Sequence, residues 1–105
     1  MIQLLKNVLG LGPKADLKAM LHHGAQIIDV RTRNEFQSGH ISGSVNIPLQ
    51  DLRKNFYKIK KGKPIITCCA SGIRSASAKS ILKSNDFTEV HNGGGWMSLQ
   101  SKIGY

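Results

Sequence analysis

The two cysteines of this sequence, Cys68 and Cys69, are neighbours at the end of an apolar run that begins at Pro64. Adjacent thiols cannot close the kind of chain loop that a structural disulfide stabilises, so we expect both to be free, in a reducing compartment. An ionised thiol is a nucleophile. We predict that Cys69 is the reactive thiol, because a loop follows it, and that Cys68 is a small buried side chain within a strand.

A short loop that could hold an anion follows Cys69. Its residues are Ala70, Ser71, Gly72, Ile73 and Arg74. Gly72 allows the backbone to curl so that successive N–H groups face inward, and Arg74 adds a permanent positive charge. The helix predicted to begin at Ser75 adds the partial positive charge of its N-terminus. Together these groups would stabilise a sulfur anion at Cys69, and the small side chains leave room for a ligand.

The rest of the sequence alternates between short apolar runs and segments of helical periodicity. We predict strands over 25–31, 45–47, 64–68 and 88–91, and helices over 14–23, 33–38, 49–57, 75–82 and 96–102. Residues 92–95 are predicted to form a flexible turn. Strands that alternate with helices indicate a mostly parallel sheet covered on both faces, and such sheets bind ligands beyond the carboxyl ends of their strands. Cys69 falls at such an end.

Three segments, in this order, resemble the signatures of the rhodanese family of sulfurtransferases. They are DVRTRNEFQSGHISGSVNIP (29–48), CASGIRS (69–75) and GGGWMSL (93–99). The resemblance implies an α/β fold, the small rhodanese-like domain, in which a five-stranded, mainly parallel sheet is flanked by helices on both faces. It implies one domain across residues 1–105, with a core over about 14–102.

The same resemblance implies a chemistry for the loop. Cys69 would be the catalytic residue, taking sulfane sulfur from a donor such as thiosulfate and passing it, through a persulfide, to cyanide or a thiol. The substrate-binding residues would be Ala70, Ser71, Gly72, Ile73 and Arg74. No metal and no organic cofactor is implied.

Charged residues upstream of the loop are interpreted as scaffold. We expect Asp29, Arg31 and Glu35 to pair with one another or with Arg74 and so to orient the loop. His40 is interpreted as a hydrogen-bonded structural histidine rather than a general base.

The same residues bear on three other functions. Phosphatases and arsenate reductases related to this family resemble the pattern with a loop one residue longer than the one between Cys69 and Arg74, so we do not expect phosphate chemistry. Adjacent cysteines also lack the spacing of zinc ligands. An alternative that stays open is a sulfur carrier or binding module that works with a protein partner and turns over small molecules poorly.

The charge of the chain favours anionic partners. Fifteen Lys and Arg residues against six Asp and Glu give a net charge of +9, which attracts small anionic sulfur donors or an acidic protein. The basic residues are spread along the chain, and only two aromatic residues lie near the cluster at 58–63, so we expect no nucleic-acid partner.

No apolar run approaches the ~20 residues that span a bilayer. Lys6 and Asn7 interrupt the amphipathic segment at 1–12, which therefore does not match a secretory signal. We expect a cytoplasmic monomer with no membrane partner.

Overall fold

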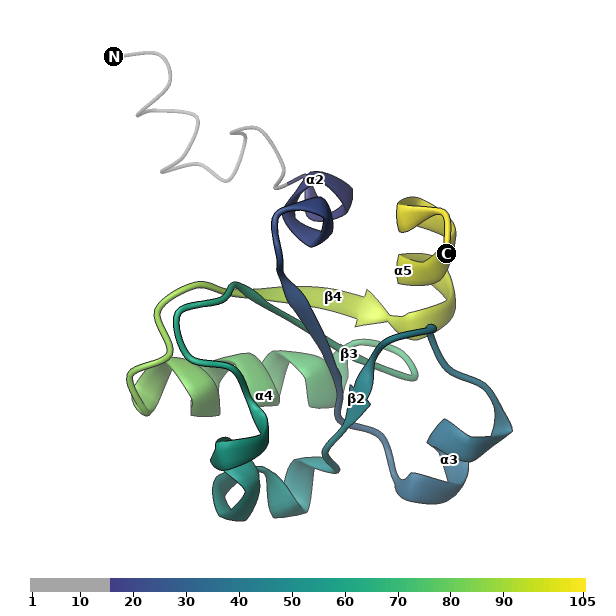
Figure 1. The fold of residues 1–105 in the computed structure, drawn as a ribbon. Coiled ribbons are helices and arrows are strands. Elements are labelled where there is room, and N and C mark those ends of the chain that lie inside the picture. The colour runs from purple at the N-terminus through teal and green to yellow at the C-terminus, as the bar shows by residue number, and fades with distance from the viewer. Residues whose placement is uncertain (1–15) are drawn as a thin grey trace, which may run out of the picture.

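A computed structural model describes residues 16–105 of the chain, in which a parallel sheet lies between two layers of helices (Figure 1). The segment at 1–12 and the start of the helix expected at 14–23 lie outside the described residues. Within residues 16–105, no helix has the length and apolar character needed to cross a membrane.

The described sheet has four strands in the order β2-β1-β3-β4, and every neighbouring pair is parallel. The strands are β1 (Gln26–Asp29), β2 (Val45–Asn46), β3 (Ile65–Cys69) and β4 (Val90–Gly95). All five residues of β3 are buried, as expected for an inner strand that has helices on both faces.

The number of strands differs from the five that the family resemblance implied. The four strands of residues 16–105 correspond to the four apolar runs from which strands were predicted. The fifth strand was implied by the resemblance alone, and no apolar run within the described residues supplies it.

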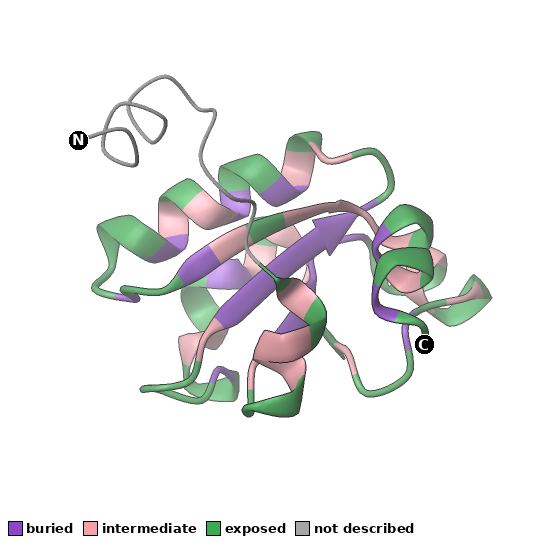
Figure 2. Cartoon of the chain, turned by 90° about the horizontal axis from the view of Figure 1, so that it is seen from above, coloured by how far each residue is buried: buried purple, intermediate pink, exposed green. Residues whose placement is uncertain are grey.

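The helices are divided between the two faces of the sheet. They are α2 (Leu17–His22), α3 (Arg33–Ser38), the 3-10 helix η1 (Leu49–Lys58), α4 (Ile73–Ser84) and α5 (Trp96–Ile103). Helices α4 and η1 cover one face, and α2 and α5 cover the other (Figure 1). Figure 2 shows buried residues concentrated in the strands and on the helix surfaces turned toward them.

Two separate apolar clusters result from this layering. Ile65 and Cys69 of β3 face the α4 side, where they join Leu82 of α4. Ile66 and Cys68 face the opposite side and join a cluster with α5. The alternation of side chains along a strand therefore sends the two cysteines to opposite faces of the sheet.

Residues 92–95 are part of β4, although they were predicted to form a flexible turn. Thr67 pairs with Asn92 and Cys69 pairs with Gly95. Between these two pairs, β4 therefore contains one residue more than β3. The extra residue makes a bulge, and Gly94 within it has a φ of +79°, which glycine adopts without strain.

Candidate active site

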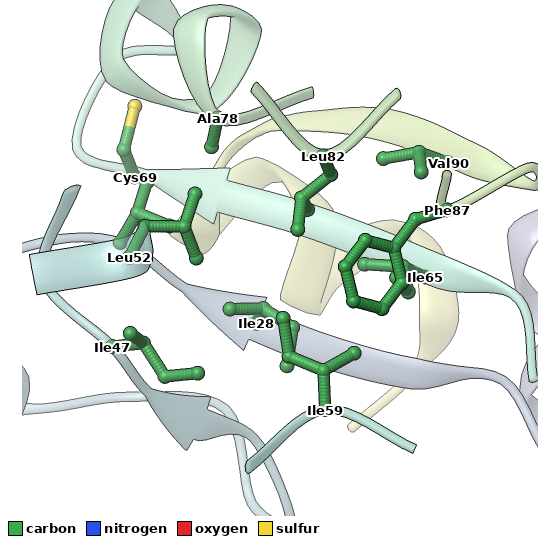
Figure 3. Packing of buried hydrophobic residues seen from close by; sticks show 11 residues of the cluster. Ile28, Ile47, Leu52, Ile59, Ile65, Cys69, Ala78, Leu82, Phe87 and Val90 are labelled. Atoms are coloured by element: carbon green, nitrogen blue, oxygen red, sulfur yellow. The ribbon is translucent and has the colours of Figure 1, made fainter. Parts of the chain in front are cut away.

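Cys69 is the last residue of β3, and α4 begins four positions later. The residue is only 1% exposed. In Figure 3 its side chain lies at the margin of the apolar cluster, with the sulfur pointing away from Ile28 and Ile47. The nucleophile predicted from the sequence therefore lies at the carboxyl end of the sheet, next to the loop that leads into α4.

Two backbone N–H groups point at this sulfur. The N–H of Gly72 donates to Sγ at 2.9 Å, and the N–H of Ser75 donates at 3.3 Å. Amide donors aimed at one atom favour negative charge on that atom. The inward-facing N–H groups expected from the sequence are present around Cys69.

The start of α4 explains why these amides are available. Gly72 precedes the helix with a φ of +109° and has no side chain to cap it. The first N–H groups of any helix lack partners within the helix, and a capping side chain normally accepts from the third residue. Ser75 is that third residue, so the Cys69 sulfur occupies the place of a helix cap.

Arg74 lies beside the loop, but its side chain is paired with a carboxylate rather than with the Cys69 sulfur. It lies inside α4, and its guanidinium makes a two-pronged ion pair with Glu35, with distances of 2.7 and 3.0 Å. None of the hydrogen bonds among residues 16–105 joins Arg74 to the Cys69 sulfur. Its charge lies near the loop, but its hydrogen-bonding groups are directed at a carboxylate.

This ion pair changes the titration of both partners. The hydrogen bond from Arg74, followed by one from the Thr32 backbone, lowers the pKa of Glu35 from 4.5 to about 2. The hydrogen bond to Glu35 raises the pKa of Arg74. About a third of each side chain is exposed, so solvent screens the interaction. The pairing confirms the expectation that Glu35 orients the residue that follows the loop.

Asp29 and Arg31 form a second ion pair, and this one is buried. Asp29 is fully buried and Arg31 is 4% exposed. The Arg31 guanidinium donates to Asp29 at 2.7 Å and to the Gly39 carbonyl at 2.7 Å, and it lies 4.7 Å from the centre of the Trp96 ring. These contacts link the end of β1 to α5, which fits the scaffold role predicted for them.

Cys68 lies in a very different environment from Cys69. It is fully buried among the apolar residues on the α5 side of the sheet. Burial, and then the charge of Asp29, raises the pKa of its thiol to about 12. The thiol stays protonated at neutral pH, as expected for a structural cysteine.

The remaining loop residues line the outside of the turn. Ala70 and Ser71 are exposed, and Ile73, the first residue of α4, is 78% exposed. Elsewhere His40 bonds the Phe36 carbonyl through Nδ1 at 2.7 Å and stacks on the Phe36 ring, in agreement with a structural role. Among residues 16–105, no three His, Cys, Asp or Glu side chains are grouped so as to hold a metal ion.

The glycines of β4 are site residues that the sequence analysis missed. A Cβ on Gly95 would lie 2.8 Å from the Ala70 carbonyl oxygen, and one on Gly72 would lie 3.5 Å from the Gly94 Cα. The backbone of β4 therefore packs directly on the loop. Three consecutive glycines in a strand are a signal of such close approach, which the prediction of a flexible turn overlooked.

Comparison with protein-family models and known proteins gives a consistent result. A family model described as "Rhodanese-like domain" matches residues 13–102. A solved structure described as "rhodanese with anions from E. coli" superposes with a TM-score of 0.67 at 31% identity, covering 71% of this chain and 91% of that one.

The names of three curated relatives indicate different activities or none. "Uncharacterized protein YqhL" of Bacillus subtilis is 42% identical over 80 residues, which are 75% of this chain and 64% of that protein. "Thiosulfate sulfurtransferase PspE" of Escherichia coli is 34% identical over 65% of this chain and 67% of that protein. "Putative sulfur carrier protein YrkF" of Bacillus subtilis is 36% identical over 63% of this chain and 36% of that protein.

Proposed function

This chain belongs to the rhodanese-like domain family, and from that membership we propose that it is a sulfurtransferase in which Cys69 carries sulfane sulfur as a persulfide. The observation that carries the proposal is the pair of N–H groups, from Gly72 and Ser75, that converge on the Cys69 sulfur. Such an arrangement favours an anionic sulfur, which is the form required both before and after transfer.

The first step loads the sulfur. The Cys69 thiolate attacks the outer sulfur of thiosulfate, a sulfur–sulfur bond forms, and the bond within thiosulfate breaks. Sulfite leaves with the electron pair, so the charges balance and no external reductant is needed. The product is a persulfide anion on Cys69, a covalent intermediate that divides one transfer into two easier steps.

The second step unloads the sulfur. A nucleophile such as cyanide or a thiolate attacks the terminal sulfur of the persulfide, and the Cys69 thiolate leaves. The N–H groups of Gly72 and Ser75 stabilise this leaving thiolate as charge returns to Sγ, which is where preorganised donors contribute most to rate. Residues 70–74 form the loop against which donor and acceptor bind, and the net charge of +9 attracts anionic donors to the molecule.

A protein-partnered sulfur carrier is the second candidate. Similarity to a protein named as a putative sulfur carrier supports this candidate. In that case Cys69 would load, but small acceptors would unload it slowly.

Intact mass spectrometry after exposure to thiosulfate tests the proposal. The expected result is a gain of one sulfur atom, mapped to Cys69, with release of one sulfite. Rapid loss of that sulfur to cyanide, with repeated turnover, supports the enzyme, whereas a stable loaded form that cyanide does not discharge supports the carrier. If thiosulfate adds no sulfur to the protein, the proposed sulfurtransferase activity is wrong.

A further inference from the structure

A short chain of polar side chains connects three elements next to Cys69. Thr67 of β3 and Ser75 of α4 are both fully buried, and their hydroxyl oxygens lie 2.7 Å apart. The Ser75 hydroxyl is also 2.6 Å from Oδ1 of Asn92 in β4. The N–H of Gly94 donates to the same Oδ1 at 2.9 Å. One serine is thus bonded to two strands at once.

The Gly94 N–H determines which atom donates in each of these hydrogen bonds. An N–H can only donate, so the atom that Gly94 bonds is the amide oxygen of Asn92 rather than its nitrogen. The Ser75 hydroxyl must therefore donate to Asn92 and use a lone pair to accept from Thr67. The Thr67 hydroxyl also lies 3.1 Å from the Ser75 carbonyl oxygen and 3.4 Å from the His91 carbonyl oxygen, so these contacts join the first turn of α4 to both β3 and β4.

Ser75 is the residue through which this chain reaches the nucleophile. Its backbone N–H is one of the two donors to the Cys69 sulfur. Gly72, which precedes α4, contributes no side chain that could fix its first turn. The bonds from the Ser75 side chain to Thr67 and Asn92 hold this turn against the sheet instead, and they do so without touching the sulfur.

We propose that Thr67 and Asn92 are positioning residues, which hold Ser75 so that its N–H stays directed at the Cys69 sulfur. This inference rests on the proposed role of Cys69 as the sulfur carrier. Thr67 shares the face of β3 with Cys69, since the two are two residues apart. Asn92 reaches Ser75 from β4, just before the bulge, where its oxygen also closes a local turn onto Gly94.

The test measures the reactivity of Cys69 toward iodoacetamide as a function of pH, with the modified residue located by mass spectrometry. Thr67→Val removes the hydroxyl and keeps the shape, and Asn92→Ala removes the accepting oxygen. Each is expected to slow alkylation about fivefold near neutral pH, on the scale of a weakened hydrogen bond to a charged group. The rates should converge with the wild-type rate at high pH, where the thiol is ionised in every variant.

Two further variants separate positioning from general stability. Thr67→Ser keeps the hydroxyl and is expected to retain the wild-type pH profile. Gln26→Ala removes two hydrogen bonds to Lys60, of 2.8 and 2.9 Å, at the far end of the sheet. It should lower the thermal midpoint and leave the alkylation profile of Cys69 unchanged.

The outcomes distinguish this inference from the proposed function. If Thr67→Val and Asn92→Ala keep the wild-type profile while losing stability, or if Thr67→Ser is as impaired as Thr67→Val, the positioning role is wrong. Alkylation does not require a sulfur donor. If the wild-type protein takes no sulfur from thiosulfate, the proposed function is wrong. The positioning role of Thr67 and Asn92 is still decided by the pH dependence of Cys69 alkylation in the variants.

Discussion

Cys68 and Cys69 have the same side chain, and their surroundings alone decide what each can do. The Cys69 sulfur accepts two N–H bonds at the start of a helix. The Cys68 thiol is enclosed by apolar side chains and has its pKa raised to about 12. Cys68 is therefore kept as a protonated thiol, whereas Cys69 has hydrogen-bond donors directed at its sulfur.

Serine substitutions at the two cysteines should give opposite results. Cys69→Ser removes the only group that can carry sulfur in this mechanism, so thiosulfate should add no sulfur to that variant. Cys68→Ser should still load, although placing a hydroxyl in the apolar cluster costs about 1–3 kcal/mol of folding free energy. Intact mass and chemical unfolding of both variants check this. Loading of Cys69→Ser together with failure of Cys68→Ser would show that the thiols were assigned in the wrong order.

The pair between Glu35 and Arg74 should make stability depend on pH in acid. The pKa of Glu35 falls from 4.5 to about 2 on folding, so the folded state binds fewer protons than the unfolded state between these values. The contribution of the pair is then complete above pH 4.5 and is lost as the pH falls toward 2. The difference in unfolding free energy between wild type and Glu35→Gln should shrink across this window.

Chemical unfolding at several pH values measures that difference directly. Its size should be modest, because solvent reaches both side chains. Thr32 is a useful second site for substitution, since its hydroxyl also donates to the Glu35 carboxylate, at 3.0 Å. A difference that stays constant from neutral pH down to pH 2 would contradict the lowered pKa.

At the scale of elements, the site depends on how closely β4 approaches the loop after β3. Gly95 has an ordinary φ of −70°, so a side chain there is opposed only by what it would touch. The nearest atom is the Ala70 carbonyl oxygen, 2.8 Å from the position of a Cβ. That oxygen belongs to the backbone and cannot move aside without moving the loop.

Gly95→Ala should therefore impair both stability and sulfur loading. Forcing a methyl group into a packed contact of this kind costs about 1–3 kcal/mol, and the displaced loop should load sulfur at least several-fold more slowly. Gly62→Ala is the matched control. Its φ of +79° makes alanine strained there, but nothing lies within 4 Å and the position is remote from the loop. It should lose comparable stability and load at the wild-type rate; equal loading by both variants would contradict the role of Gly95.

Local sequence patterns predicted a helix or strand well where neighbouring residues determine its ends. Helix α3 has the predicted bounds, Arg33–Ser38, because Thr32 and Glu35 cap its start reciprocally. Helix α4 begins at Ile73, two residues before the predicted start at Ser75. Its cap is the sulfur of Cys69 at the end of a strand, which no pattern of capping side chains reveals.

The features that were missed depend on contacts between distant segments. A Cβ on Gly93 would lie 2.7 Å from the Thr67 carbonyl oxygen, so the glycines of β4 are set by β3 rather than by a turn. Arg74 pairs with Glu35, 39 residues earlier. The sequence suggested that such a pairing was available but did not show that it would occupy the guanidinium. The fold was predicted from the resemblance to a family, and the four strands of the described residues were predicted from the apolar runs.

At the scale of the whole molecule, the net charge of +9 acts on every anion that approaches. Thiosulfate carries two negative charges, and a positively charged protein raises its rate of encounter. Salt screens this attraction over about 8–10 Å at physiological ionic strength. The charge therefore affects how fast the donor arrives rather than the chemistry at the sulfur.

Raising the ionic strength should slow sulfur loading by thiosulfate. From about 0.01 M to about 1 M salt, where the screening length falls from about 30 to about 3 Å, we expect the second-order rate constant to fall several-fold. Alkylation of Cys69 by iodoacetamide, a neutral reagent, is the control and should change little. Equal dependence of the two reactions on salt would exclude steering by charge.

The placement of the two thiols on opposite sides of the sheet has a consequence for oxidative damage. A sulfenic acid formed at Cys69 is normally rescued by a second thiol that condenses with it to a disulfide. Cys68 is the nearest thiol in sequence, but its side chain lies in the apolar cluster on the other side of β3, and a disulfide requires the two Cβ atoms to approach on a common side. While β3 remains paired, repair of an oxidised Cys69 must come from a reductant outside the molecule.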